Sequence, residues 1–552
     1  MPTINFSLKD LQNLVGKKLA VSQIEEYASF AKGDFEGYDN ETDEIKIDFG
    51  DTNLPYLWSV EGFAIFLKGI LEVERGLPKL NSRSGNYKII VDKSVSSVRP
   101  YAAGFVAKGH KIDDYLIKQM IQLQEKVCDN FGRKRRKIAI GVYSYDKITW
   151  PVHYKAVEPE SVKFVPLEFK REMSLGEILE SHPKGKDYAF ILEGFKKYPV
   201  LVDSKNEVLS FPPIINSNFS GKIEIGDEHL FVEATGTDLE ALQQALNIFA
   251  FALQFRGFEI LSVDIQYPDR TIKSPHEFNE SINVDLKQVH SILGLELSEA
   301  EMKKCLERMR YGYKNGKAFI PDYRRDIMHP VDVIEDIAIG YGYMNLKPLP
   351  LTGYTAGGEL DIIPFIDKIR DIVSGAGYQE VFSPVLSNKE LLCSRMNTKD
   401  SGTVEISEYM SESFSVVRSW ILPILMDVLS KNRHVEYPQK IFEQGLATER
   451  AGSEITDSEK IAIASAHHKA GYTEIRQILD MTARALGVSF EISETEHDSF
   501  LAGRVAVASF RGKKIAILGE IHPKVLENFG IEVPVVAMEM DLSNLFALVK
   551  PS

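Results

Sequence analysis

The chain has 552 residues, and 65 Lys or Arg against 79 Asp or Glu give it a net charge of −14. Hydrophobic residues make up 44% and charged residues 26% of the sequence, which is typical of folded domains and excludes wholesale disorder. At roughly 150 residues per domain, this length predicts about four domains. The acidic balance argues against a protein that binds nucleic acid over much of its surface.

Cysteines and apolar runs limit the remaining classes. Cys128, Cys305 and Cys393 lie far apart without a Cys-x-x-Cys pair, so neither a disulfide scaffold nor a cysteine zinc site is expected. The first residues lack the apolar core of a signal peptide, and no apolar run reaches the ~18 residues of a membrane span. We therefore expect a cytosolic protein without a membrane partner.

Residues 1–85 predict an N-terminal α/β domain with a helix over 58–71, and the polar stretch 81–86 marks its boundary. The composition then changes, because residues 86–150 hold 13 Lys or Arg and 6 Asp or Glu. Five of these basic residues are consecutive, between a helical pattern and a strand pattern. They favour either a solvated helix end or a phosphate contact: Arg133, Lys134, Arg135, Arg136 and Lys137.

The segment 86–262 predicts one α+β domain, with strands at 198–202, 207–211 and 230–236. A helix follows from Asp238, and Thr237 with Glu240 matches a capping box. Hydroxyl, amide and carboxyl side chains gather at these strand ends. They either line a hydrolytic pocket or serve as a turn and helix cap: Ser210, Asn216, Glu233, Thr235, Thr237 and Asp238.

The segment 268–348 predicts a compact helix-sheet module with helices over 287–293, 298–309 and 330–341. Four acidic residues lie at the start of its last helix, three of them at spacings i, i+3 and i+4 on one face. With no Lys or Arg expected on that face, they indicate a Mg²⁺ or Ca²⁺ site: Asp326, Asp332, Glu335 and Asp336. Alternatively, acidic residues simply favour a helix N-terminus.

After a linker over 346–358, residues 355–552 alternate helix and strand patterns and predict a larger antiparallel α+β domain. No G-x-x-x-x-G-K-[ST] or G-x-S-x-G motif occurs in the chain, and residues 355–552 lack the G-x-G-x-x-R pattern of an ATP site. The sequence thus predicts a mixed α+β multidomain fold without a self-sufficient nucleotide site.

Taken in order, these motifs resemble those of the archaeal and eukaryotic-type phenylalanyl-tRNA synthetase β subunits over nearly the whole chain. The segments that carry the resemblance are Asn53 with Pro55, 58–62, 99–101, 132–137, 140–141, 209–216, 235–238, 321–327, His329, 332–343, Arg418, 422–423, 438–443, 503–504 and 519–523.

This resemblance implies an obligate partner of a catalytic alpha subunit in an (αβ)₂ heterotetramer that charges tRNA(Phe) in the cytoplasm. ATP and phenylalanine would bind the alpha subunit, and residues 355–552 would be a class II synthetase-like domain without an active site. Residues 86–262 would be the editing domain (B3/B4-type), which hydrolyses mischarged Tyr-tRNA(Phe). Its pocket would be Leu201, Ser210, Glu233 and Thr235, with Asn216 and Asp238 nearby.

In the same resemblance, residues 268–348 correspond to a B5-type module that binds Mg²⁺ through Asp326, Asp332, Glu335 and Asp336, and the basic run 133–137 would contact tRNA. Because the chain as a whole carries a net charge of −14, we expect the tRNA footprint to be local and shared with the alpha subunit.

The sequence also departs from the family pattern. Tyr143 and Ser144 replace a common His-Asp pair, Leu54 and Tyr56 replace an Arg and an Asp, and residues 404–408 lack an Asn-Pro. The first change leaves a second reading open, in which the chain is a non-catalytic tRNA-docking scaffold with a decayed editing pocket. A third reading is a stand-alone Mg²⁺-dependent hydrolase.

Overall fold

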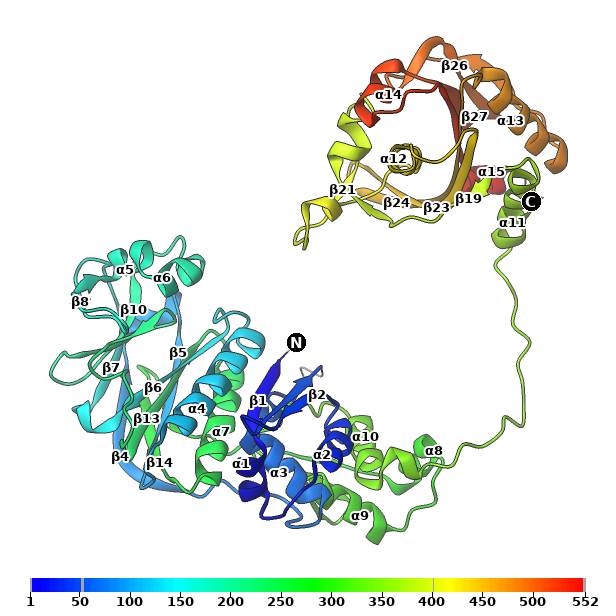
Figure 1. Cartoon of the computed structure of the whole chain (residues 1–552). Helices are drawn as coiled ribbons and strands as arrows, with labels where there is room; N and C mark the ends of the chain where they lie inside the picture. The colour runs from blue at the N-terminus through cyan, green and yellow to red at the C-terminus, as the bar shows by residue number, and fades with distance from the viewer. Residues whose placement is uncertain (1, 51–53, 401, 550–552) are drawn as a thin grey trace. The chain divides into compact units, whose positions relative to one another are not determined.

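The computed structural model describes residues 2–50, 54–400 and 402–549, so Asn53 lies outside the described part. The chain forms two compact units, Met1–Leu349 and Pro350–Ser552 (Figure 1). Helices and several sheets occur in both units, which confirms the predicted α+β multidomain fold. In the described residues, no helix combines the length and apolar character needed to cross a membrane.

The first unit begins with a small α/β module. Its antiparallel sheet has the order β1-β3-β2 and packs against three helices. The predicted helix over 58–71 is α3, which Ser59 caps by accepting a hydrogen bond from the Gly62 backbone. The elements are β1 (Thr3–Ser7), α1 (Leu8–Val15), α2 (Val21–Phe30), β2 (Gly33–Asp39), β3 (Glu44–Phe49) and α3 (Val60–Ile70).

A ten-stranded mixed sheet dominates the middle of the first unit. Its main path has the order β12-β11-β10-β7-β4-β14-β5-β13-β6, with β15 paired to β14. The predicted boundary at residue 262 falls within β14, which pairs in parallel with β4. The strands are β4 (Ser82–Val91), β5 (Tyr101–Lys108), β6 (Ile138–Ser144), β7 (Val152–Val157), β10 (Tyr198–Val202), β11 (Val208–Phe211), β12 (Ile215–Asn216), β13 (His229–Gly236), β14 (Glu259–Gln266) and β15 (Thr271–Ser274).

Two long helices accompany this sheet, and α7 begins at Leu239 with Asp238 as its cap, one residue later than the predicted start at Asp238 with Thr237 as the cap. The Asp238 carboxylate accepts a hydrogen bond from the Ala241 backbone, so the predicted Thr237 capping box is wrong by one residue. A small lobe contains the remaining short elements. The long helices are α4 (Asp114–Lys126) and α7 (Leu239–Phe255), and the short elements of the lobe are β8 (Lys163–Phe164), β9 (Met173–Ser174), α5 (Leu175–Ser181) and α6 (Pro183–Tyr188).

The last module of the first unit has a three-stranded sheet, order β16-β18-β17, and three helices. The predicted capping box of Ser298 and Glu301 is confirmed, and α10 has the limits that the sequence predicts. Its elements are β16 (Ser281–Asn283), α8 (Leu286–Leu293), α9 (Glu299–Arg308), β17 (Gly312–Lys314), β18 (Lys317–Phe319) and α10 (Pro330–Tyr341).

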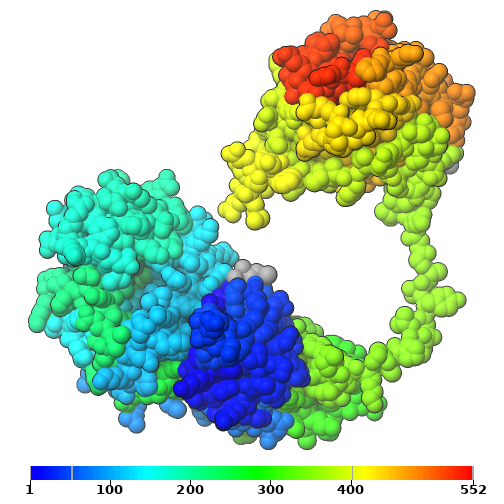
Figure 2. Space-filling view, in the orientation of Figure 1, coloured from blue at the N-terminus to red at the C-terminus, as the bar shows by residue number. Residues whose placement is uncertain are grey.

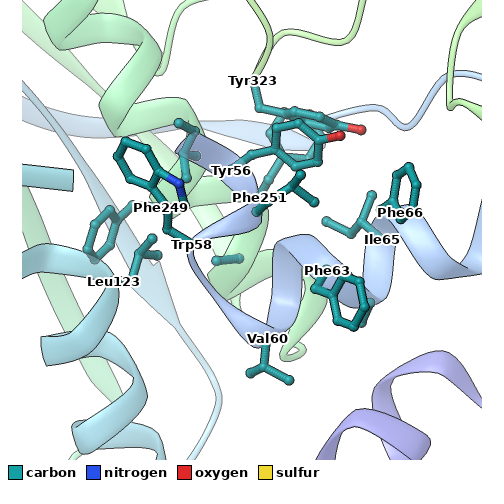
Figure 3. Packing of buried hydrophobic residues seen from close by; sticks show 14 of the residues in the cluster. Tyr56, Trp58, Val60, Phe63, Ile65, Phe66, Leu123, Phe249, Phe251 and Tyr323 are labelled. Carbon is teal, nitrogen blue, oxygen red and sulfur yellow. The ribbon is translucent and has the colours of Figure 1, made fainter. Parts of the chain in front are cut away.

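One hydrophobic core runs through all three modules of the first unit. Figure 3 shows Tyr56, Phe251 and Tyr323, from three different modules, packed ring against ring. The Tyr323 ring centroid lies 4.7 Å from that of Tyr56 and 5.0 Å from that of Phe251. The modules therefore stabilise one another. Figure 2 shows the N-terminal module, in blue, directly against the cyan and green parts of the first unit.

The second unit is built on a seven-stranded sheet, order β19-β23-β24-β28-β27-β26-β25, in which only the β19–β23 pair is parallel. The predicted antiparallel character of this region is thus confirmed for the other pairs. The sheet strands are β19 (Gln379–Glu380), β23 (Gln439–Ala451), β24 (Glu454–Ala466), β25 (Glu491–Glu494), β26 (Phe500–Phe510), β27 (Lys513–Ile521) and β28 (Val535–Asp541).

In the described part of the second unit, five helices and a small sheet accompany the large sheet, and one ion pair is fully buried. The Arg418 guanidinium lies 2.6 Å from the Glu443 carboxylate, which also accepts the Ser383 hydroxyl. These elements are α11 (Ile362–Gly375), β20 (Leu386–Ser387), β21 (Val404–Glu405), β22 (Val416–Val417), α12 (Leu422–Lys431), α13 (Tyr472–Leu486), α14 (Pro523–Phe529) and α15 (Leu542–Val549).

Candidate functional site

A pocket of about 310 Å³ opens in the middle of the first unit, between α4 and the edge strands of the large sheet. Across the pocket region, the edge strand β6 meets the segment after β12: the Ser144 backbone N–H donates to the Ser220 carbonyl at 2.9 Å. The lining is mostly apolar, with a few inward polar groups that include Ser210, Asn216 and Glu233. Such a mixture is typical of sites for small ligands, and this volume lies at the small end of their range.

The Tyr143 hydroxyl connects the polar groups of this pocket. It lies 2.8 Å from Ser210 Oγ, 2.8 Å from Glu233 Oε1 and 3.5 Å from Asn216 Oδ1. The tyrosine is fully buried, its ring stacks on Phe231, and burial raises its pKa well above 10. Tyr143 therefore remains a neutral phenol that holds three polar side chains of the predicted site in one cluster.

Glu233 is the strongest electrostatic feature of the pocket. Burial raises the pKa of its carboxyl to about 8, although the Tyr143 hydrogen bond and the Arg99 charge both act to lower it. Its second oxygen, Oε2, is buried and has no hydrogen-bond partner among the described residues. An unsatisfied carboxyl oxygen beside a pocket is costly, and a polar ligand atom would relieve that cost.

Glycine at position 141 makes room for this cluster. Gly141 lies directly opposite Glu233 in the β6–β13 ladder. A Cβ at residue 141 would lie 2.3 Å from the Tyr143 hydroxyl and 2.6 Å from Glu233 Oε1, which is closer than van der Waals contact allows. The positions of both oxygens therefore depend on the missing side chain.

Leu201, Thr235 and Asp238 do not line the pocket. Leu201 packs in the core beneath it, directly opposite Ser210 in the β10–β11 ladder. Thr235 Oγ1 accepts a hydrogen bond of 3.0 Å from the buried Arg99, and Asp238 caps α7. The structure thus brings together Ser210, Asn216 and Glu233 of the predicted set, whereas its other members lie outside the pocket lining: Leu201, Thr235, Thr237 and Asp238.

Sequence reasoning missed Tyr143, which it marked only as a departure from the family. Gly141 and Tyr143 are two residues apart in one strand, so strand alternation already puts them on the same face. That signal becomes useful only once the pairing of β6 with β13 is known.

The predicted basic run divides into internal and exposed members. Arg135 donates to the carbonyls of Pro213 and Ile214 at 3.2 and 3.0 Å, and Lys137 pairs with Asp238 at 3.1 Å. The guanidinium of Arg136 lies over the Phe190 ring, 4.7 Å from its centroid, and Arg136 is exposed. Arg133 and Lys134 are exposed as well. The run is thus only in part a free basic surface: Arg133, Lys134 and Arg136.

The four carboxylates predicted to bind Mg²⁺ do not converge. The Arg324 guanidinium lies between two of them: it pairs with Asp336 at 2.6 Å and also with Asp326. Asp332 accepts the backbone N–H groups of Met328 and His329 at the start of α10.

Glu335, the fourth carboxylate, pairs with Lys32 at 2.9 Å. Across residues 2–50, 54–400 and 402–549, no group of three or more His, Cys, Asp or Glu is arranged to hold a metal ion. The expectation of a face without basic partners was wrong. Because the buried Arg324 guanidinium lies between Asp326 and Asp336 and the other two acids have partners elsewhere, the arrangement does not fit a divalent cation.

Two family models match this chain: "tRNA synthetase B5 domain" over residues 282–343 and "Phenylalanyl tRNA synthetase beta chain CLM domain" over residues 348–542. The chain is 41% identical to the phenylalanine–tRNA ligase beta subunit of Thermococcus sibiricus, with 98% of each chain covered. It is also 41% identical to that of Pyrococcus horikoshii, covering 99% of this chain and 100% of the relative.

A solved structure supports the same likeness. It is an N-terminal fragment of the phenylalanyl-tRNA synthetase beta subunit from Pyrococcus horikoshii, with 40% identity and a TM-score of 0.60. The match covers 62% of this chain and 100% of the fragment.

Proposed function

This chain belongs to the family of phenylalanine–tRNA ligase beta subunits, and we propose that its pocket hydrolyses tyrosine from mischarged tRNA(Phe) within an alpha–beta complex. The observation that carries the proposal is the buried cluster of Ser210, Tyr143 and Glu233 beside an amino-acid-sized pocket. In this proposal the chain is an editing subunit of a ligase rather than a stand-alone hydrolase.

Charging belongs to the alpha subunit in this proposal. Residues 355–552 lack a G-x-G-x-x-R pattern, and Arg418 and Glu443 of the second unit form a buried ion pair with each other. ATP and phenylalanine therefore bind the alpha subunit, and two copies of each chain form an (αβ)₂ heterotetramer in the cytoplasm.

The pocket suits a tyrosyl group because it offers a hydrogen-bond partner to a phenol. The free oxygen of Glu233 gains a partner from tyrosine and stays unpaired with phenylalanine. A site that hydrogen-bonds a substrate hydroxyl rejects the analogue lacking it by about 10⁴–10⁵. This difference protects correctly charged Phe-tRNA(Phe) from hydrolysis.

Ester hydrolysis needs an oriented water and a stabilised oxyanion rather than a strong nucleophile. In the proposed role, Ser210 and Glu233 meet the substrate, while Leu201 and Thr235 support the pocket wall from behind. The terminal hydroxyl of the tRNA is a further group that orients water.

Deacylation of Tyr-tRNA(Phe) by the purified alpha–beta complex tests the function. We expect release of tyrosine but not of phenylalanine, and no Phe-AMP formation by the beta chain alone. A complex that charges tRNA(Phe) normally but releases no tyrosine would instead support the reading of a scaffold with a decayed pocket.

A second test concerns tRNA contact. Replacing Arg133, Lys134 and Arg136 together by alanine removes three exposed cations, so we expect the slope of log affinity against log salt to fall by about 3. Filter binding of tRNA(Phe) to the complex at several salt concentrations measures this slope. Lys17→Ala, in an exposed loop of the N-terminal module, should leave it unchanged. An unchanged slope in the triple variant would remove these residues from the tRNA interface.

A further inference from the structure

The cluster of Ser210, Tyr143 and Glu233 contains two internal hydrogen bonds, one on each side of the Tyr143 hydroxyl. With an ionised Glu233 the cluster has two protons, and both are used: Ser210 donates to Tyr143, and Tyr143 donates to the carboxylate. With a neutral Glu233 it has three protons, so one donor is left over. When Glu233 Oε1 carries the third proton, it donates to Tyr143, Tyr143 donates to Ser210, and the Ser210 hydroxyl is the spare donor beside the pocket.

Other charged and titratable groups lie near Glu233. Among the described residues, Tyr143 is the group that hydrogen-bonds both Ser210 and Glu233. The Arg99 guanidinium donates hydrogen bonds to Thr235 and to the backbone carbonyls of Arg135 and Arg136. Tyr154 donates to the Arg99 carbonyl. The charged residues that line the same pocket are Glu125, Arg135, Glu168, Lys184 and Lys222.

We propose that Tyr143 is a positioning residue that joins Ser210 and Glu233 into one hydrogen-bond relay, through which the carboxyl of Glu233 decides whether the pocket presents a donor. This inference rests on the proposed editing function. The ester carbonyl of an aminoacyl-tRNA can only accept hydrogen bonds, so the form with the spare donor is the hydrolytic one. Because burial raises the pKa of Glu233 to about 8, that form prevails at neutral pH and is lost as the pH rises through 8.

The test is the pH profile of Tyr-tRNA(Phe) deacylation by the alpha–beta complex with wild-type and Tyr143→Phe chains. In the wild type, we expect kcat to fall above an apparent pKa near 8. Tyr143→Phe frees the Ser210 proton at every pH and removes the contact that lowers the pKa of Glu233. The variant should therefore lose the alkaline limb near pH 8. Its kcat at pH 7 should fall about tenfold, with little change in KM, because no hydroxyl then positions Ser210 and Glu233 relative to each other.

Tyr267→Phe is the matched control, because it also removes a buried tyrosine hydroxyl, one whose hydrogen bonds within the described residues are with the Ala102 backbone. Its profile should follow the wild type. A Tyr143→Phe profile that keeps the wild-type limb would overturn the relay while leaving the editing function intact. A wild-type complex that releases no tyrosine at any pH would overturn the function and the relay together.

Discussion

Glu233→Ala should lower kcat/KM for Tyr-tRNA(Phe) hydrolysis by about 10²–10³, the usual effect of removing one preorganised polar group from a reacting centre. The variant loses both the oxygen that bonds Tyr143 and the free oxygen beside the pocket. Charging of tRNA(Phe) with phenylalanine should continue at the wild-type rate, because Glu233 belongs to the first unit of the beta chain. Single-turnover deacylation and aminoacylation assays on the same complex measure both.

Glu207→Ala is the control for this change, since Glu207 is an exposed acid in the same domain, just before β11. It should hydrolyse Tyr-tRNA(Phe) like the wild type. Undiminished hydrolysis in Glu233→Ala would remove the pocket from the reaction. Equal losses of hydrolysis and charging would mean that the residue supports the assembly and not the chemistry.

Arg324→Met should destabilise the first unit by about 3–5 kcal/mol, because it leaves two acids beside each other without their buried cation. Arg324 is 3% exposed and pairs with Asp326 and with Asp336, whose pKa burial raises. Hydrogen exchange of the α9 and α10 amides in the alpha–beta complex measures the local loss of stability. Adding the change Asp336→Leu should recover part of it, since it removes the buried acid as well.

Lys303→Met breaks an exposed pair with Glu307 in the same module and should cost less than about 1 kcal/mol. In the wild type, a chelator should leave the exchange of α10 unchanged, because Arg324 supplies the positive charge. Loss of α10 protection on chelation would contradict this and would restore the magnesium interpretation.

Local patterns predicted single elements well where both ends carry signals. The helix α10 has the limits that the sequence predicts because Pro330 starts it and Gly342, with φ of +97°, ends it. The capping box at Ser298 is another case. The cap of α7 was wrong by one residue, because Thr237 and Asp238 both suit a cap and only the fold decides between them.

The candidate site shows why pattern alone did not suffice. Glu233 and Thr235 share a face of β13, so alternation puts both in the pocket, yet Arg99 binds Thr235 from a distant part of the chain. Arg324 stands two residues before Asp326 in the sequence, but its direction depends on the packing of α9 and α10. Register between strands and the direction of a long side chain are set by contacts remote in sequence.

The hydrogen bonds of Arg99 have a mechanical consequence. One planar guanidinium holds the hydroxyl and the carbonyl of Thr235 behind the pocket and, at 3.1 Å each, the carbonyls of Arg135 and Arg136. The strand behind the pocket and the turn with the exposed cations are thereby hydrogen-bonded to the same planar group. We therefore expect the distance between the pocket and the exposed cations of the 133–136 turn to stay constant.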